Sequence, residues 1–377
     1  MSGLYIHIPF CKQACSYCDF YFLTRQEFRQ PFVDALLNEI RSYADSPFSK
    51  QKIETIYIGG GTPSLLSASQ LESIFGEIES VFTLDTKEVT MELNPDDVTK
   101  PYLRELLSIG VNRASMGVQS FDEDLLTFMH RAHNPTEALN ALKALSETGF
   151  PTFTADLIYG SPGQTPDMLL NDIERLLRFN PPHISAYSLT IEPGTRLGKQ
   201  AELGRLSMPE DDDVAEQFDL LSGTLSANGI EQYEVSNFSI PGKEAVHNSN
   251  YWRHKNYLGL GPSAHSFYWQ GEQALRWQNA ADLKNYIAGK DIKTEEENLS
   301  PVQLAEERLM LGLRTKRGVQ VDELTNRYQY RLNNRQQDWI RNQQAIGNFA
   351  DTPGMLKLTG DGLKIADYLV IELLAKA

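Results

Sequence analysis

The stretch Leu4-Tyr-Ile-His-Ile-Pro-Phe-Cys11-Lys-Gln-Ala-Cys15-Ser-Tyr-Cys18 joins an apolar, strand-like segment to a loop that holds all three cysteines of the chain. The spacing is Cys-x3-Cys-x2-Cys, so one loop offers three thiolates and no fourth. Such a set suits a [4Fe–4S] cluster in which one iron stays open for a ligand from outside the protein. The odd number and the tight spacing of the cysteines argue against a disulfide framework.

The same loop also permits a zinc site. His7 lies four residues before the first cysteine, so a His-x3-Cys-x3-Cys-x2-Cys set would supply the four nitrogen and sulfur ligands that structural zinc takes. These residues alone leave both kinds of site open, and the cluster is the one that we expect.

Composition places the chain among globular proteins with a substantial core. It has 377 residues, of which 41% are hydrophobic, enough for one large domain and a smaller one. The formal net charge of −15 argues against a nucleic-acid partner. No apolar run is as long as a membrane span, and no basic segment of a signal peptide precedes the first strand. Few cysteines in a single motif fit a reducing compartment, so we expect a cytoplasmic protein.

Residues 1–195 alternate short β-rich runs with amphipathic segments, which is typical of βα units around a parallel sheet. The predicted strands are Leu4–Ile8, Ile53–Ile58, Val89–Leu93, Arg113–Met116, Thr152–Ile158 and His183–Leu189. The predicted helices are Pro31–Tyr43, Ala68–Val81, Lys100–Ser108, Asp122–Met129, Pro135–Thr148 and Pro166–Phe179. Six units are fewer than the eight of a closed TIM barrel. We therefore expect an α/β fold built on a partial (β/α)6, TIM-like barrel.

The rest of the chain follows two other patterns. Residues 196–298 read as a connecting region: a helix near Pro209–Asn228, a short strand at Gln232–Val235, and then a loop rich in aromatic residues, glycine and histidine. Residues 299–377 read as a helical module similar to a winged helix. Its predicted elements are helices Pro301–Gly312, Val321–Tyr328 and Asn334–Gln344, strand Met355–Leu358 and a final helix Asp361–Ala375.

Polar residues and glycines lie in or after the predicted parallel strands, with Arg131 just past a predicted helix, and the strand ends carry the chemistry of α/β folds. They are the Gly59–Pro63 turn, Glu92, Gln119, Arg131 and Asp156. The glycines let the backbone approach a ligand closely, and an acid in an apolar strand needs partners. Together with the cysteine loop, this rim predicts a pocket for a zwitterionic, ribose-bearing ligand beside a cluster, which S-adenosylmethionine (SAM) matches.

These motifs resemble the radical SAM superfamily, and within it the branch of the anaerobic coproporphyrinogen III oxidases (HemN) and their haem-chaperone relatives (HemW). The similarity covers nearly the whole chain. Its residues are Tyr5–Cys11 with Cys15 and Tyr17–Phe20, Gly59–Pro63, Glu92 with Asn94 and Pro95, Arg113–Phe121, Asp156–Gly160 and Tyr257–Gly261. The resemblance implies the partial barrel with a C-terminal HemN-type helical domain.

The resemblance also implies roles for individual residues. Cys11, Cys15 and Cys18 match the cluster ligands. The positions that match SAM contacts are Tyr5, Gly60, Gly61, Thr62, Glu92, Gln119, Arg131 and Asp156. The implied cofactors are therefore a [4Fe–4S] cluster and SAM.

Three departures separate the chain from the oxidases. Asp19 and Phe20 follow the third cysteine where the oxidases have a further cysteine, and the long N-terminal extension is missing. The segment His247-Asn-Ser-Asn-Tyr251-Trp252 is similar to the His-Asn-x-x-Tyr-Trp signature of the haem chaperones. Neutral imidazole is a good axial ligand of haem iron, and Tyr and Trp rings can pack on a flat macrocycle.

We therefore expect a haem chaperone on a radical SAM scaffold, with haem near His247, Tyr251 and Trp252 and with His254 and His265 as other possible ligands. The resemblance implies delivery of haem to respiratory proteins, and a homodimer. The alternatives are an oxygen-independent coproporphyrinogen III oxidase, or another tetrapyrrole-modifying radical SAM enzyme, and a zinc-binding barrel without redox chemistry. The sequence does not decide whether the protein is an enzyme.

Overall fold

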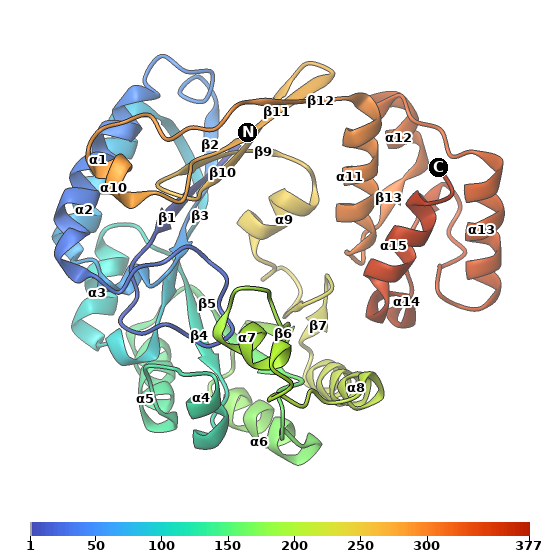
Figure 1. The fold of residues 1–377 in the computed structure, drawn as a ribbon, viewed down its shortest axis with the longest axis horizontal. Helices are drawn as coiled ribbons and strands as arrows, with labels where there is room; N and C mark the ends of the chain where they lie inside the picture. Colours follow the sequence, from blue (N-terminus) through green and yellow to red (C-terminus); the bar gives the residue numbers. More distant parts are fainter. Residues whose placement is uncertain (1) are drawn as a thin grey trace.

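A computed structural model describes residues 2–377. Six parallel strands form its centre, and amphipathic helices cover their outer face (Figure 1). The strands are β1 (Ser2–Ile8), β2 (Lys52–Gly60), β3 (Thr83–Leu93), β4 (Arg113–Gln119), β5 (Thr152–Tyr159) and β6 (His183–Ser188). The helices are α1 (Arg29–Ser42), α2 (Ala68–Val81), α3 (Lys100–Ser108), α4 (Glu123–Phe128), α5 (Pro135–Thr148) and α6 (Pro166–Leu177). The predicted partial barrel is confirmed. Most of its elements lie close to the expected bounds, but β3 begins six residues earlier than predicted, at Thr83 and not at Val89.

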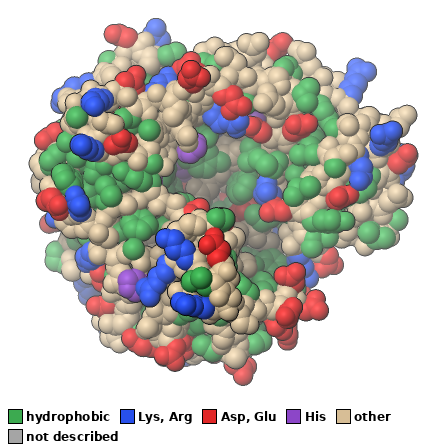
Figure 2. Space-filling view, in the orientation of Figure 1, with side chains coloured by type: hydrophobic (Ala, Val, Ile, Leu, Met, Phe, Trp, Pro, Cys, Tyr) green, Lys and Arg blue, Asp and Glu red, His purple; other side chains and the backbone are tan. Residues whose placement is uncertain are grey.

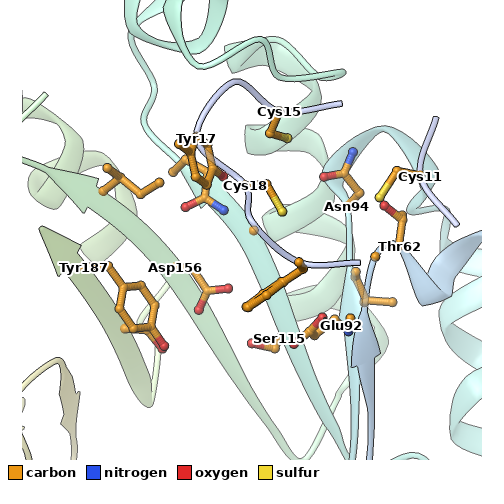
Figure 3. A pocket seen from close by; sticks show the side chains of 18 of the residues that line it. Cys11, Cys15, Tyr17, Cys18, Thr62, Glu92, Asn94, Ser115, Asp156 and Tyr187 are labelled. Carbon is orange, nitrogen blue, oxygen red and sulfur yellow. Dashed lines mark hydrogen bonds between the residues drawn. The ribbon is translucent and has the colours of Figure 1, made fainter. Parts of the chain in front are cut away.

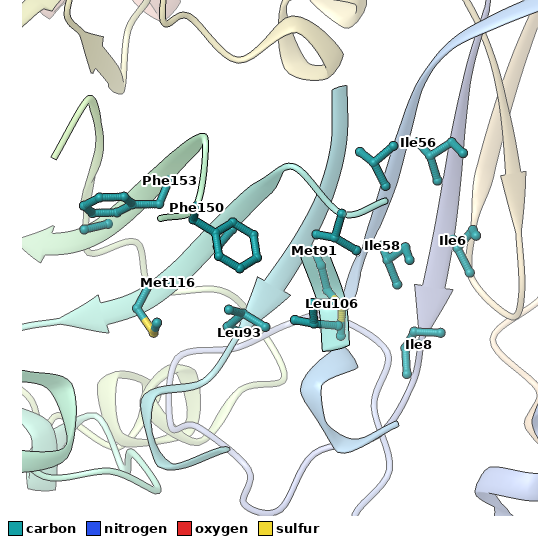
Figure 4. Packing of buried hydrophobic residues seen from close by; sticks show 14 of the residues in the cluster. Ile6, Ile8, Ile56, Ile58, Met91, Leu93, Leu106, Met116, Phe150 and Phe153 are labelled. Atoms are coloured by element: carbon teal, nitrogen blue, oxygen red, sulfur yellow. The ribbon is translucent and has the colours of Figure 1, made fainter. Parts of the chain in front are cut away.

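Alternation along the strands gives the sheet an apolar outer face and a polar inner face. In Figure 4 the outward-facing side chains of β1 to β5, such as Ile6, Ile58 and Met116, pack in one apolar cluster. Ile6, Ile58 and Met116 are fully buried there. The residues between them point to the opposite face, since successive strand side chains alternate, and many of these inner residues are polar.

The connecting region contains more strand than the sequence predicted. Its elements are α7 (Arg196–Glu202), α8 (Asp211–Ala227), β7 (Glu231–Gln232), β8 (Asn237–Ser239), α9 (Val246–Trp252), β9 (Asn256–Leu260), β10 (His265–Gln270), β11 (Gln273–Gln278), α10 (Leu283–Ile287) and β12 (Glu297–Leu299). They extend the sheet to the order β12-β11-β10-β9-β1-β2-β3-β4-β5-β6-β8-β7. The expectation of a long irregular loop was wrong because β9 pairs in parallel with β1, a partner distant in sequence.

The C-terminal module stands beside the barrel (Figure 1). It comprises α11 (Pro301–Leu313), β13 (Val319–Gln320), α12 (Val321–Tyr328), α13 (Asn334–Ala345), β14 (Met355–Leu356), α14 (Gly360–Lys364) and α15 (Ala366–Leu374). The predicted single final helix is wrong: it breaks at Ile365, whose backbone leaves the helical region at φ −119° and ψ 29°. Within residues 2–377, no helix combines the length and the apolar character needed to cross a membrane.

Candidate functional site

A cavity of about 530 Å³ lies between the cysteine loop and the inner face of the barrel strands. Figure 3 shows side chains of the loop and of β2 to β6 converging on it. Its lining includes most of the predicted site residues: Cys11, Cys15, Cys18, Gly60, Gly61, Thr62, Glu92, Gln119, Arg131 and Asp156. The fold therefore brings together side chains that are up to about 150 positions apart in the sequence.

Backbone hydrogen bonds hold the cysteine loop at the strand ends. The amide of Cys11 donates to the carbonyl of Leu23 at 3.0 Å, and the amide of Ser16 donates to Met129 at 3.0 Å. The Ser16 hydroxyl donates to the Phe128 carbonyl at 2.8 Å. The loop is thus fastened to β1's exit on one side and to the end of α4 on the other.

The three cysteines fit a cluster better than a zinc ion. All three are free thiols that face one cavity, and cluster thiolates bind separate irons rather than one ion. Both ring nitrogens of His7 are already engaged, Nδ1 with the Tyr5 hydroxyl at 3.0 Å and Nε2 with the Tyr21 carbonyl at 2.8 Å. Among the described residues, no three His, Cys, Asp or Glu side chains are arranged around a single metal position. His7 would have to give up one of its two hydrogen bonds to become the fourth ligand of a zinc ion.

The protonation state of the cysteine thiols determines whether they can bind iron. Burial raises the pKa of Cys11 to about 11 and that of Cys18 to about 12. A thiolate is the form that ligates iron, so loading the loop must release protons. The Arg131 guanidinium donates to Cys15 Sγ at 3.3 Å and offers a positive charge next to these ligands.

The glycine turn after β2 brings backbone close to the loop and to an acid. A side chain at Gly61 would meet the carbonyl oxygens of Phe10 and Ile8 at 2.7 and 2.9 Å. The amide of Gly60, at φ +108°, donates to Glu92 Oε2 at 3.0 Å. Tyr57 donates its hydroxyl to Glu92 Oε1 at 2.7 Å. The turn thus needs glycine for steric reasons, and it fixes the carboxyl group of Glu92 in the cavity wall.

Arg131 and Gln119 form the wall opposite the glycine turn. Arg131 donates to Gly117 O at 3.0 Å and also to Asn94 Oδ1, while its buried Nε has no partner among the described residues. Gln119 has φ +67° at a bulge between β4 and β5. Left-handed backbone in a residue other than glycine is strained and gathers at functional sites.

Asp156 is the acid of β5, as the sequence predicted. Burial raises the pKa of Asp156 to about 7, and the charge of Glu92 adds to the rise. The two carboxyl groups therefore share a desolvated region in which one proton is readily held. Such a group can donate or accept a hydrogen bond near neutral pH.

Tyr5 is the one predicted SAM residue that the structure places outside the cavity lining. Its ring stacks on Tyr57 with 6.1 Å between centroids, and its hydroxyl bonds to His7. Because Tyr57 is its register partner on β2 and itself lines the cavity, Tyr5 stands behind this wall.

The predicted haem segment forms α9, not a loop, at the inner end of the cavity. His247 is 2% exposed. Its Nδ1 bonds to Thr55 Oγ1 and its Nε2 to the Tyr251 hydroxyl, both at 2.8 Å. Asn248 lines the cavity, while the predicted haem residues His247, Tyr251 and Trp252 do not. Of the other candidate ligands, His254 is buried and His265 is exposed.

Sequence reasoning missed the inner layer of the cavity, which consists of Thr90, Arg113, Ser115, Thr154, His183, Ser185 and Tyr187. A signal was present. In each of β3 to β6, polar residues alternate with apolar ones, and these polar residues share one face of the sheet.

Comparison with known proteins agrees with this geometry. Residues 5–176 match the model of the radical SAM superfamily. The chain is 38% identical to the heme chaperone HemW of Lactococcus lactis, over 87% of this chain and 85% of that one. It is 36% identical to the heme chaperone HemW of Bacillus subtilis, over 87% of both chains.

The chain belongs to the HemW family of radical SAM proteins. The radical SAM family implies a [4Fe–4S] cluster and SAM as cofactors. The structure of coproporphyrinogen III oxidase (HemN) from Escherichia coli superposes with a TM-score of 0.84 at 21% identity, over 98% of this chain and 89% of that one. This likeness shows that the HemW-family chain shares the HemN fold.

Proposed function

We propose that this protein binds haem and hands it to haem-dependent respiratory proteins, as a homodimer. The observation that carries the proposal is the position of α9. Its His-Asn-x-x-Tyr-Trp segment closes the inner end of the cavity through Asn248, in a chain whose relatives are named heme chaperones. The molecule is also hollowed near the middle of the face in Figure 2, with hydrophobic side chains at the edge of the hollow. An apolar macrocycle suits such an edge.

We propose that Cys11, Cys15 and Cys18 hold the cluster and that Gly60, Gly61, Thr62, Glu92, Gln119, Arg131 and Asp156 surround SAM, with Tyr5 supporting Tyr57 from behind. When bound, the cluster would supply single electrons to the sulfonium of SAM. The side chains have simpler tasks. Arg131 places a positive charge beside the thiolates and can pair with a carboxylate, while Glu92 and Asp156 can accept hydrogen bonds from an amine or from ribose hydroxyls.

His247 must exchange a hydrogen bond before it can bind iron. Both of its nitrogens are engaged, and burial lowers the pKa of His247 to about 3, so the ring is the neutral base that iron requires. Its Nε2 becomes free if the Tyr251 hydroxyl moves away. Removing the Tyr251 hydroxyl by substitution with phenylalanine removes the hydrogen bond that competes with iron for His247 Nε2. The aromatic ring at position 251 is kept.

Haem titration of two variants tests this assignment. We expect His247→Ala to weaken haem binding at least about tenfold, and Tyr251→Phe to strengthen it, because about 1 kcal/mol of competing hydrogen bond is lost. His265→Ala is the control and should leave the Kd unchanged. Absorption spectra of the Soret band would report both Kd and ligation. Haem binding that is insensitive to His247→Ala and abolished by His265→Ala would assign the ligand to His265 instead.

The second candidate is an oxygen-independent coproporphyrinogen III oxidase or a related tetrapyrrole-modifying enzyme. The observation that favours it is the complete polar wall around the cavity, with Glu92, Arg131 and Asp156 all present. An anaerobic assay with cluster-loaded protein, SAM and a reductant separates the two. Protoporphyrinogen as product would establish the oxidase. A lack of porphyrin product, with haem transferred to an acceptor protein, would establish the chaperone.

The homodimer is tested separately, by light scattering of the protein before and after haem is added. We expect twice the mass of the single chain in the haem-loaded sample. A monomer in both samples would remove the dimer from the proposal and leave haem binding as it stands.

A further inference from the structure

The inner end of the cavity is a polar chamber that the cluster and the rim do not explain. A closed barrel normally fills this position with branched apolar side chains. Here the inward residues of β3 to β6 in this layer are Thr90, Arg113, Thr154 and His183, all almost fully buried. Pairing places Thr90 beside Arg113 and Thr154 beside His183, so four neighbouring strands build one layer.

Two polar atoms of this layer have no partner in the described part of the chain. They are Thr90 Oγ1 and His183 Nδ1, on side chains that are each 1% exposed. A buried polar atom without a partner costs on the order of 1–3 kcal/mol, and a ligand can recover that cost. Both residues line the cavity, so the unpaired atoms mark a place where a ligand group fits.

The hydrogen bonds around His183 show which group would fit. Tyr233 Oη accepts from the Ala245 amide at 3.3 Å and lies 2.8 Å from His183 Nε2. The Tyr233 hydroxyl hydrogen has no other acceptor in the described part of the chain, so we infer that it is donated to Nε2 and that, in this neutral ring, Nδ1 carries the hydrogen. His183 Nδ1 is then a donor. The other donors of this layer are the Thr90 hydroxyl and the Arg113 guanidinium, and one nitrogen of the guanidinium donates to Thr154 Oγ1 at 2.7 Å.

Charges in the chamber are compatible with a carboxylate. Arg113 faces Glu88 at 3.9 Å, so that pair is neutral in sum. Asp156 and Ser185 form the next layer, and burial raises the pKa of Asp156 to about 7, which lets this acid keep a proton beside an incoming anion. A group with two acceptor oxygens would then meet donors on several sides.

We propose that this inner chamber binds a carboxylate arm of the haem, an inference that rests on the proposed haem-binding function. Propionates are the only strongly polar groups of haem. The chamber would hold one of them against Thr90, Arg113 and His183, next to Asn248 at the inner end. The chamber thereby sets the orientation of the macrocycle and selects porphyrins with free carboxyl arms.

Two porphyrins and a matched pair of variants test the chamber. Haem and haem dimethyl ester differ only in their carboxyl groups. In His183→Gln the amide oxygen takes the place of Nε2 and accepts from the Tyr233 hydroxyl, whereas in His183→Asn the amide nitrogen takes the place of Nδ1 and keeps the chamber donor. We expect wild-type protein to bind the ester at least about tenfold more weakly than haem. We expect His183→Gln to lose a similar factor for haem and nothing for the ester, and His183→Asn to stay near wild type.

A second pair of variants, at Thr90, tests the chamber independently in case the substitutions at His183 prevent folding. Thr90→Val should weaken haem about tenfold and Thr90→Ser should restore it, with unchanged circular dichroism in all variants. If wild-type protein binds haem and the ester equally well, the proposal that the chamber binds a carboxylate is wrong. It is also wrong if His183→Asn loses affinity for haem and His183→Gln does not, because His183 would then only support Tyr233. Wild-type protein that binds neither porphyrin overturns the proposed function together with the chamber.

Discussion

Asp156 shows at the scale of one residue how the site is balanced against stability. It is held in a largely apolar strand because the cavity gives it a partly open environment beside Ser185 and Glu92. Its pKa of about 7 in the folded chain lies well above the value of about 3.9 in an unfolded chain. The folded state therefore favours the protonated acid, and its stability falls as the pH rises from about 4 through about 7.

Asp156→Asn should remove this loss. We expect the variant to be more stable than wild type at pH 8, on the order of 4 kcal/mol in the ligand-free protein, and by only about 1 kcal/mol at pH 4.5. Urea unfolding at the two pH values measures the difference. Glu234, whose burial also raises its pKa to about 7, keeps part of the pH dependence in both proteins. A stability difference that does not change with pH would show that Asp156 is ionised throughout.

At the scale of an element, α9 depends on one buried acid. Glu88 of β3 accepts the amides of Val246 at 2.8 Å and His247 at 2.9 Å. These amides belong to the first turn of the helix, where the backbone has no internal partners. Glu88 therefore fixes the position of the helix whose Asn248 faces the cavity.

Glu88→Gln should loosen this anchor. An amide group replaces one acceptor by a donor and leaves the Arg113 charge without its neighbour, so we expect a loss of about 1–3 kcal/mol in unfolding free energy. Glu72→Gln on the exposed face of α2 is the control and should stay within about 0.5 kcal/mol of wild type. Urea titrations give both values. Equal stability of the two variants would mean that α9 is held by its other contacts.

At the scale of the whole molecule, the chain has two large apolar cores. One lies between the sheet and the helices α1, α2, α3, α5 and α6, and the other lies mainly among α11 to α15. The second core also contains Phe267 of β10 and Ala274 of β11. We propose that residues 299–377 form a separate unit, as the sequence indicated, but one that needs the extended sheet to complete its core.

His254 lies where the two parts meet. Its ring stacks on Phe267 at 4.5 Å and on Tyr328 of α12 at 6.0 Å between centroids, and its Nε2 is 3.3 Å from Glu307 of α11. Burial lowers the pKa of His254 below its usual value of 6.5. Folding therefore favours the neutral ring, and the stability that it contributes is lost as the pH falls below about 6.5.

His254→Phe should make the protein less sensitive to acid, because phenylalanine can keep the two stacking contacts and does not titrate. We expect wild type to lose more unfolding free energy than the variant between pH 7.5 and pH 5.5. Other buried histidines titrate in the same direction and contribute equally to both proteins, so the difference isolates His254. Identical losses would assign the acid sensitivity to those other histidines.

The sequence by itself determined the features that depend on local pattern. The Cys11–Cys18 spacing places three thiols on one loop whatever the fold. The two-residue and helical periodicities predicted the six βα units and most bounds within a few residues, because these periods follow from strand and helix geometry. The strand ends also indicated Glu92, since the carboxyl ends of parallel strands meet at one rim. Asp156 was indicated as an acid within an apolar strand, and Arg131 as a guanidinium just past a helix.

Only the tertiary structure decided what depends on pairing between distant segments. It placed β9 beside β1, turned the His247 segment into the helix at the inner end of the cavity, and moved Tyr5 behind Tyr57. It also gathered Thr90, Arg113 and His183 into one buried layer. Neighbours along the chain carry no record of these contacts, because register and burial are set by residues on other strands, from about 20 to about 250 positions away.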